Sequence, residues 1–95
     1  MEKRELAKMR RRLKALHKEL GELGPVMRGS VVVIGTRNKQ PYFSLNKNKK
    51  TQLIYLGRKR QDRARQYSAN YKRLREIVEE MTQFNMALLK ENYDI

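Results

Sequence analysis

The sequence predicts an α+β protein in which two long helices form an antiparallel coiled-coil hairpin, with a small three-stranded antiparallel sheet inserted between them. Two observations carry this prediction. Apolar residues repeat at heptad spacing near both ends of the chain, and the middle contains three short runs of β-branched and aromatic residues separated by turn residues. With 95 residues, the chain is expected to form a single domain, 1–95.

The first predicted helix covers residues 1–24. Its apolar residues follow one another at intervals of three and four, so they share one stripe, the expected coiled-coil seam: Leu6, Met9, Leu13, Leu16, Leu20 and Leu23. Glu2 and Glu5 stand in the first turn, where carboxylates interact favourably with the helix dipole. Gly24 and Pro25 then end the helix.

The middle of the chain, residues 28–57, is predicted to form a three-stranded meander. Strands are expected over residues 30–36, 42–45 and 51–56. Residues 37–41 are predicted to be a linker, because Pro41 can begin an edge strand but has no N–H to donate inside a sheet. The tetrad 46–49 contains two asparagines, which tolerate the left-handed conformations of hairpin turns. The sequence leaves open which face of the sheet packs on the helices.

The second predicted helix covers residues 61–92, with Asp62 in its first turn. Its expected seam consists of Tyr67, Tyr71, Leu74, Val78, Met81 and Leu88. Ile77 and Phe84 would widen this stripe on one side. Asn85 also falls at a seam position, where it either fixes register and oligomeric state or lies in a fraying last turn. Because a second copy could cover either seam, a homo-oligomer stays open.

The chain is strongly basic, with 23 Lys and Arg against 10 Asp and Glu and a net charge of +13. Such a domain usually has a nucleic acid or another polyanion as its partner, since the charges otherwise repel one another. Residues 28–60 contain nine basic residues and no acidic one. In an antiparallel hairpin the acidic residues of the second helix would pair with the basic start of the first, which leaves the positive excess on the sheet.

The predicted nucleic-acid-binding surface lies in the sheet region and at the start of the second helix. Its members are Arg28, Arg37, Asn38, Lys39, Tyr42, Lys47, Lys49, Lys50, Arg58, Lys59, Arg60 and Arg63. Cations bind phosphates, a sheet can enter the major groove of a duplex, and exposed tyrosines can stack on unpaired bases. DNA is favoured over RNA as the partner. Tyr42 and Tyr55 fit cross-strand packing as well as they fit stacking.

Catalysis is not expected. The only histidine, His17, lies beside an apolar stripe, there is no cysteine, and no residues stand at metal-ligand spacing, so neither a metal nor a cofactor is predicted. No apolar run approaches the roughly 20 residues of a membrane span, and the charged N-terminus is unlike a signal peptide, which favours a cytoplasmic location. Two alternatives remain: a coiled-coil adaptor that binds another protein without touching nucleic acid, and an RNA-binding module.

Four motifs within residues 28–89 resemble an uncharacterised family of small proteins encoded by bacteria, archaea and their mobile elements, often near transposase genes. The motifs are RGSVVVIGT, PYFSL, TQLIYLG and YxxNYKRLREIVEEMTQFNMALL. The resemblance implies a role in a larger nucleoprotein or transposition-type complex. Family members commonly carry a cysteine-containing turn between the first two strands; here RNKQ replaces it, so no metal-linked role is carried over. The strand region is also similar in architecture to the three-stranded DNA-binding modules of tyrosine-type integrases, an analogy that assigns no residue.

Overall fold

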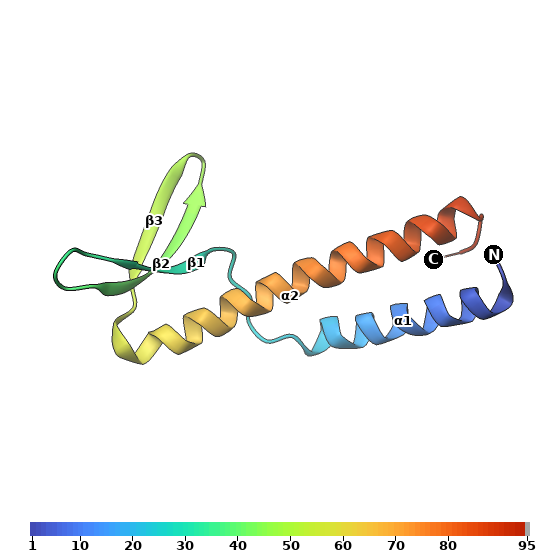
Figure 1. Cartoon of the computed structure of the whole chain (residues 1–95), viewed down its shortest axis with the longest axis horizontal. Helices are drawn as coiled ribbons and strands as arrows, with labels where there is room; N and C mark the ends of the chain where they lie inside the picture. Colours follow the sequence, from blue (N-terminus) through green and yellow to red (C-terminus); the bar gives the residue numbers. More distant parts are fainter. Residues whose placement is uncertain (95) are drawn as a thin grey trace. The chain divides into compact units, whose positions relative to one another are not determined.

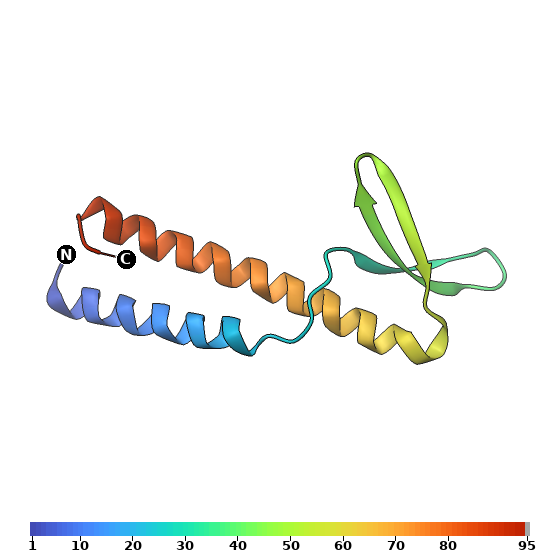
Figure 2. The same ribbon diagram turned by 180° about the vertical axis from the view of Figure 1, so that it is seen from behind.

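The structure is a computed structural model that describes residues 1–94 and contains two helices and a three-stranded antiparallel sheet (Figures 1 and 2). The α+β class is therefore confirmed. The elements are α1 (Lys3–Glu22), β1 (Ser30–Ile34), β2 (Gln40–Lys47), β3 (Lys50–Tyr55) and α2 (Gly57–Lys90). The chain divides into two compact units: unit 1 comprises Met1–Leu23 and the chain from Arg73 onward, and unit 2 comprises Gly24–Lys72. None of the helices in this part of the chain has the length and apolar content needed to cross a membrane.

Unit 1 is a pair of antiparallel helical segments, α1 and the part of α2 that begins at Arg73. Every residue of the stripe predicted for α1 is at least partly buried, and Leu16 has no exposed surface. The α2 segment contributes a second apolar stripe at heptad spacing: Leu74, Ile77, Met81, Phe84 and Leu88. Ile77 is 0% and Leu88 1% exposed, so these two side chains and Leu16 are the most deeply buried of this unit.

The seam predicted for the second helix is wrong by one register at its middle. Val78 is 51% exposed, whereas its neighbour Ile77 is fully buried. The predicted and the observed stripe share Leu74, Met81 and Leu88, which are spaced by one heptad. From Leu74 onward, the two stripes differ only at the positions between these residues. The observed register places Ile77 and Phe84 at these positions, whereas the predicted register would place Val78 and Asn85 there. Ile77 and Phe84 are the larger apolar side chains, so the observed register removes more apolar surface from water. Asn85 is partly buried, and its Oδ1 has no hydrogen-bond partner within the described structure.

Tyr67 and Tyr71, the first two residues of the predicted seam, belong to unit 2 and not to the helix pair. The Tyr67 backbone oxygen accepts a hydrogen bond from Met27 N at 3.1 Å. Tyr67 also lines a hollow together with Phe43 of the sheet. A single heptad count along α2 fails here because the two parts of this helix pack against different elements.

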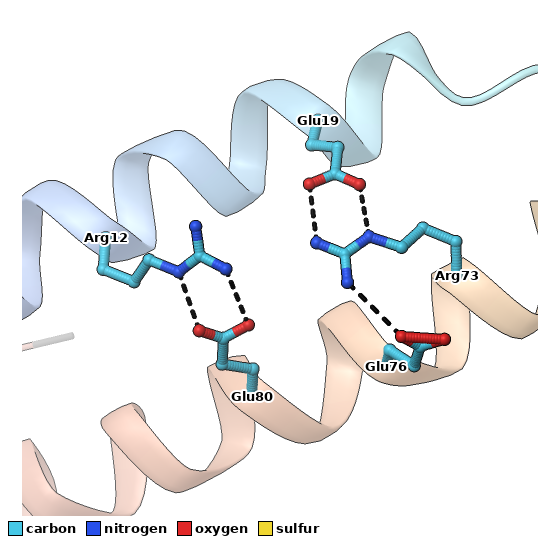
Figure 3. A network of polar contacts seen from close by, with 5 residues as sticks. All are labelled: Arg12, Glu19, Arg73, Glu76 and Glu80. Carbon is cyan, nitrogen blue, oxygen red and sulfur yellow. Dashed lines mark hydrogen bonds and ion pairs between the residues drawn. The ribbon is translucent and has the colours of Figure 1, made fainter.

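Two bidentate ion pairs join the helical segments of unit 1 (Figure 3). Arg12 donates to both carboxylate oxygens of Glu80, at 2.7 and 3.0 Å. Arg73 donates to both oxygens of Glu19 and lies 3.5 Å from Glu76 on its own helix. These hydrogen bonds lower the pKa of Glu19 and of Glu80. The expected pairing between the basic start of α1 and the acidic part of α2 is confirmed for Glu80.

Unit 2 contains the sheet, with strand order β1-β2-β3, and the start of α2. Phe43 on the central strand lies opposite Val31 on β1 and Ile54 on β3. It is 5% exposed and packs with Leu56 and Ala64 in the core of this unit. The face that carries Phe43, here called the inner face, therefore packs on α2, which answers the question that the sequence left open.

Strand β2 is twice as long as predicted and includes Pro41, which was expected in a linker or at the start of an edge strand. Pro41 is the second residue of the central strand and lies opposite Val33. Its carbonyl oxygen accepts a hydrogen bond from Leu56 N at 3.0 Å, so its missing N–H faces the same side. On that side Leu56 is next in register after Tyr55, so the proline removes only the reciprocal bond to the Leu56 oxygen, which accepts from Arg60 Nε instead.

The connection between β2 and β3 is a two-residue turn, Asn48-Lys49, with φ angles of 53° and 62°. Two successive left-handed residues characterise the type I′ turn, whose twist matches that of the strands. Asn46 lies outside the turn, contrary to the prediction, and sits opposite Thr51, whose hydroxyl donates to Asn46 Oδ1 at 2.7 Å. The turn therefore fixes the register of the hairpin with a lysine in a position that usually favours glycine.

The chain before β1 is held against α2 by three hydrogen bonds: Asn70 Nδ2 to Pro25 O (2.9 Å), Met27 N to Tyr67 O (3.1 Å) and Ser68 Oγ to Gly29 O (2.7 Å). Gly29 has a φ of 137°, a conformation that other residues rarely adopt. A Cβ atom at this position would lie 2.6 Å from the Ser44 oxygen and 2.7 Å from Phe43 Cζ. Only glycine allows this close approach to the central aromatic ring.

We predict that Gly29→Ala lowers the free energy of unfolding by about 1–3 kcal/mol, because the added methyl group meets both a left-handed backbone and the Phe43 ring. The matched control is Gly21→Ala in α1, where a Cβ meets nothing within 4 Å. That change should stabilise the protein by up to about 1 kcal/mol, since alanine favours the helix. Urea denaturation followed by circular dichroism measures both. Equal effects of the two substitutions would contradict this account of Gly29.

We predict that unit 1 loses stability in acid. Because the pKa values of Glu19 and Glu80 lie below the ordinary value of 4.5, their ion pairs contribute fully above that value. The contribution disappears as the pH falls through the lowered pKa values. The double variant Glu19→Gln, Glu80→Gln should therefore be less stable than the parent at pH 7 and equally stable in strong acid.

Urea denaturation at a series of pH values measures this difference. Glu22→Gln is the control, because Glu22 is exposed and takes part in no ion pair of the described structure. It should keep the acid dependence of the parent protein. A double variant that also kept that dependence would show that the two pairs do not stabilise the fold.

Candidate nucleic-acid interface

The positive charge of the protein is concentrated in unit 2. Residues 24–72 contain twelve Lys and Arg and a single acidic residue, Asp62, which gives a net charge of +11. The rest of the chain contains eleven basic and nine acidic residues, a net charge of +2, and the two values add up to the total of +13. Unit 1 therefore nearly neutralises itself, whereas unit 2 does not.

Two exposed basic loops lie at opposite ends of β2. The β1–β2 loop carries Arg37, Asn38 and Lys39, and the β2–β3 hairpin carries Lys47, Lys49 and Lys50; all six are exposed. We call these the loop tip and the hairpin tip. Figures 1 and 2 show that the two tips point in different directions from a bent sheet. At about 3.3 Å per residue, the path along β2 between them is roughly 23 Å.

The first turn of α2 holds a third group of cations: Arg58, Lys59 and Arg60. The helix was predicted to begin near residue 61 with a carboxylate in its first turn, but it begins at Gly57 and its first turn contains no acidic residue. Cations at this end oppose the helix dipole, whereas anions are favoured there. The N-terminal end of α2 therefore favours a negative charge, and no residue of its first turn supplies one.

Arg60 differs from the other predicted site residues because its guanidinium is already engaged. Its Nε donates to the carbonyl oxygen of Leu56 at 3.2 Å, and its NH2 group donates to that of Tyr55 at 2.6 Å. It thus connects the end of β3 to the start of α2. We assign Arg60 a structural role and remove it from the candidate interface.

The remaining predicted cations of the site, Arg28 and Arg63, are both exposed. Arg28 lies beside the sheet, where its NH1 group donates to the backbone oxygen of Asn46 at 3.0 Å. Two further exposed cations were absent from the predicted site: Arg65 and Lys72, which line a shallow hollow against the start of β1. They follow Arg58 at intervals of seven, and this spacing could have revealed them.

Tyr42 and Tyr55 lie together on the face of the sheet opposite Phe43, which we call the outer face. Their ring centroids are 5.5 Å apart in an edge-to-face arrangement. The Tyr55 hydroxyl donates to Gln40 Oε1 at 3.1 Å, and Tyr55 is 48% exposed. The predicted cross-strand packing is therefore present, on a surface that faces away from the core of unit 2. Tyr55 was absent from the predicted site, but we add it to the candidate interface because it packs on Tyr42 on the same exposed face.

No protein-family model, curated protein or solved structure matches this chain. The candidate interface is therefore defined by its own geometry and charge. Among residues 1–94, no group of three or more His, Cys, Asp or Glu side chains is arranged to hold a metal ion. His17 is exposed on α1.

We predict that Arg58→Asp stabilises the protein while weakening anion binding. A carboxylate in the first helical turn interacts favourably with the dipole, by about 0.3–1 kcal/mol at low ionic strength. Thermal unfolding followed by circular dichroism measures the gain. Sulfate should raise the melting temperature of the parent more than chloride does at equal ionic strength, and it should have a smaller effect on the variant.

The control Arg65→Asp makes the same change of charge inside the helix, away from its first turn. It relieves the same net repulsion but gains nothing from the dipole, so it should stabilise the protein less than Arg58→Asp does. Equal stabilisation by the two variants would attribute the effect to net charge alone.

Proposed function

We propose that this protein is a non-catalytic DNA-binding accessory protein whose contacts are made by unit 2. The observation that carries the proposal is the charge of +11 on residues 24–72 against +2 on the rest. The proposed interface comprises Arg28, Arg37, Asn38, Lys39, Tyr42, Lys47, Lys49, Lys50, Tyr55, Arg58, Lys59, Arg63, Arg65 and Lys72. Phosphates would relieve the repulsion among these cations and occupy the positive end of α2.

Most of the affinity in this proposal is electrostatic. Each phosphate that a Lys or Arg neutralises releases condensed counterions, so the logarithm of the binding constant falls linearly with the logarithm of salt concentration. If about six phosphates are contacted, the slope is roughly −5 on duplex DNA and roughly −4 on a single strand. The two tips and the start of α2 offer enough exposed cations for such a number.

Unit 1 has a different part in the proposal. We infer that its helix pair is an antiparallel coiled coil that acts as a nearly neutral scaffold, with Leu16 and Ile77 in its seam. The proposed setting is cytoplasmic, in a nucleoprotein complex of the transposition type that the sequence resemblance implies.

A second candidate function is favoured by a separate observation in unit 1. Val78, Met86 and Leu89 are 51%, 59% and 67% exposed, and their spacing puts them on one side of α2. A stripe of this kind suits a protein partner, as an adaptor would need. An adaptor without nucleic-acid contacts predicts no salt-dependent binding to DNA, so the experiment below separates the two functions.

We predict that fluorescence anisotropy detects DNA binding at about 50 mM salt. The log–log slope of the binding constant against salt concentration should be roughly −5 for a duplex and roughly −4 for a single strand. The hairpin-tip variant, Lys47→Glu with Lys49→Glu and Lys50→Glu, should bind at least ten-fold more weakly. It should also reduce the magnitude of the slope by about 2–3, because three phosphate contacts are lost.

The matched control is Arg11→Glu with Lys14→Glu and Lys18→Glu, three exposed residues of α1. It makes the same change of net charge in unit 1 and should leave most of the affinity intact. If both variants lose affinity equally, the binding reflects overall charge and the assignment to unit 2 is wrong. The absence of binding by the parent protein would refute the proposed function.

A further inference from the structure

The outer face of the sheet is uncharged and combines apolar and aromatic side chains with uncharged polar ones. The ten strand residues that alternate with the inner-face residues are Ser30, Val32, Ile34, Gln40, Tyr42, Ser44, Asn46, Thr51, Leu53 and Tyr55. Leu53 and Tyr55 are each 48% exposed and Ile34 is 43% exposed. In a chain that is 35% charged, a face without a single charged residue needs an occupant that is itself apolar at its centre.

Cations lie at both ends of this face and none lies on it. The loop tip lies beyond one end of β2 and the turn residue Lys49 beyond the other, and Arg28 is bonded to the backbone of Asn46 near the second. Lys47 and Lys50 of the hairpin tip alternate onto the inner face at the same end of the sheet. The occupant must therefore combine flat apolar groups in the middle with negative charges along its length. A second copy of the chain does not fit this description, because the two copies would bring their basic tips together.

The polar side chains of the face are partly committed to one another. Thr51 donates to Asn46 Oδ1, and Tyr55 donates to Gln40 Oε1. A sheet that reads a duplex through its major groove uses charged and amide side chains that reach the base edges. Here Arg and Lys are absent from the face and two of its amide oxygens are occupied, so the face is poorly suited to that purpose.

We propose that the outer face binds a single strand of DNA, with unpaired bases stacked on the Tyr42–Tyr55 pair and phosphates held by the two tips. This inference rests on the proposed function and adds the strandedness of the ligand. Aromatic rings on a sheet accept any base, because every base has an apolar face, while a basic surround follows the sugar-phosphate backbone. The edge-to-face arrangement keeps the two rings in different orientations, so each can take a different base.

The inference also predicts little dependence on base sequence. Stacking is tolerant of base identity, and the two amide oxygens of the face, which could accept hydrogen bonds from bases, are already paired. The path of roughly 23 Å along β2 corresponds to a short strand of a few nucleotides between the tips.

The test compares a fluorescently labelled twelve-nucleotide oligothymidylate with a labelled mixed-sequence duplex of equal length, at about 50 mM salt. The single strand should bind at least ten-fold more tightly. Tyr42→Leu with Tyr55→Leu should reduce single-strand affinity by at least about 30-fold, because two stacked bases are lost, and should reduce duplex affinity by a smaller factor. The corresponding double change to phenylalanine should recover most of the loss.

Tyr93→Leu is the control, because Tyr93 is an exposed tyrosine of unit 1 and should leave single-strand affinity unchanged. Since the chain has no tryptophan, its own fluorescence comes from tyrosine, and stacking should quench it in the parent but less in the leucine variant. Circular dichroism tests whether the leucine variant is folded. If it is unfolded, the comparison of tyrosine quenching in the parent with that in the single variant Tyr55→Leu tests the stacking instead.

Four outcomes would overturn part of the proposal, and they are distinguishable. Equal or tighter binding to the duplex, with loss of affinity in the hairpin-tip variant alone, overturns the single-strand inference and leaves the proposed function standing. No binding to any nucleic acid overturns both. Loss of affinity in the leucine variant without quenching in the parent overturns the stacking. Ten-fold tighter binding to oligouridylate overturns the assignment to DNA in favour of RNA.

Discussion

Both units depend on α2, because neither α1 nor the sheet carries enough apolar surface to form a core alone. In unit 2, Phe43 lies in one buried cluster with Ala64 of the helix and with Leu56, which stands between β3 and α2. In unit 1, Leu16 of α1 is buried in the same unit as Ile77. The 34-residue helix α2 thus provides a packing surface to unit 2 with its first part and to unit 1 with the part that begins at Arg73. Its sequence must satisfy two different partners, which explains why it has no single hydrophobic period.

This division also marks the limit of prediction from the sequence. The type and order of the elements follow from local periodicity, and these were correct. The register of α2 was wrong at Val78, because residues one heptad apart are compatible with two seams and only packing selects one. Pro41 was misassigned because the effect of a missing N–H depends on which strand lies beside it, and this is a property of the assembled sheet.

The candidate interface divides in the same way. The basic residues could be identified from composition, since charges on turns stay exposed whatever the register. The role of Arg60 could not, because its two carbonyl partners come together only when α2 starts four residues earlier than predicted. The side of the sheet on which Tyr42 and Tyr55 meet also lay beyond the sequence, because alternation gives two faces and only the core packing of Phe43 tells them apart.

Three locally unfavourable features of the fold lie in unit 2. Three cations occupy the first turn of a helix, a charge of +11 is carried by a unit with three buried apolar residues in its core, and large apolar side chains are exposed on the outer face. Each feature lowers stability when unit 2 is free and is relieved by an anionic ligand with flat apolar groups. A ligand that binds only the folded state adds stability in proportion to the logarithm of its concentration over its dissociation constant. Conflicts between local preference and fold are expected at functional sites. Their coincidence in unit 2, where one kind of ligand relieves all three, is therefore a physical argument that unit 2 functions in a bound state.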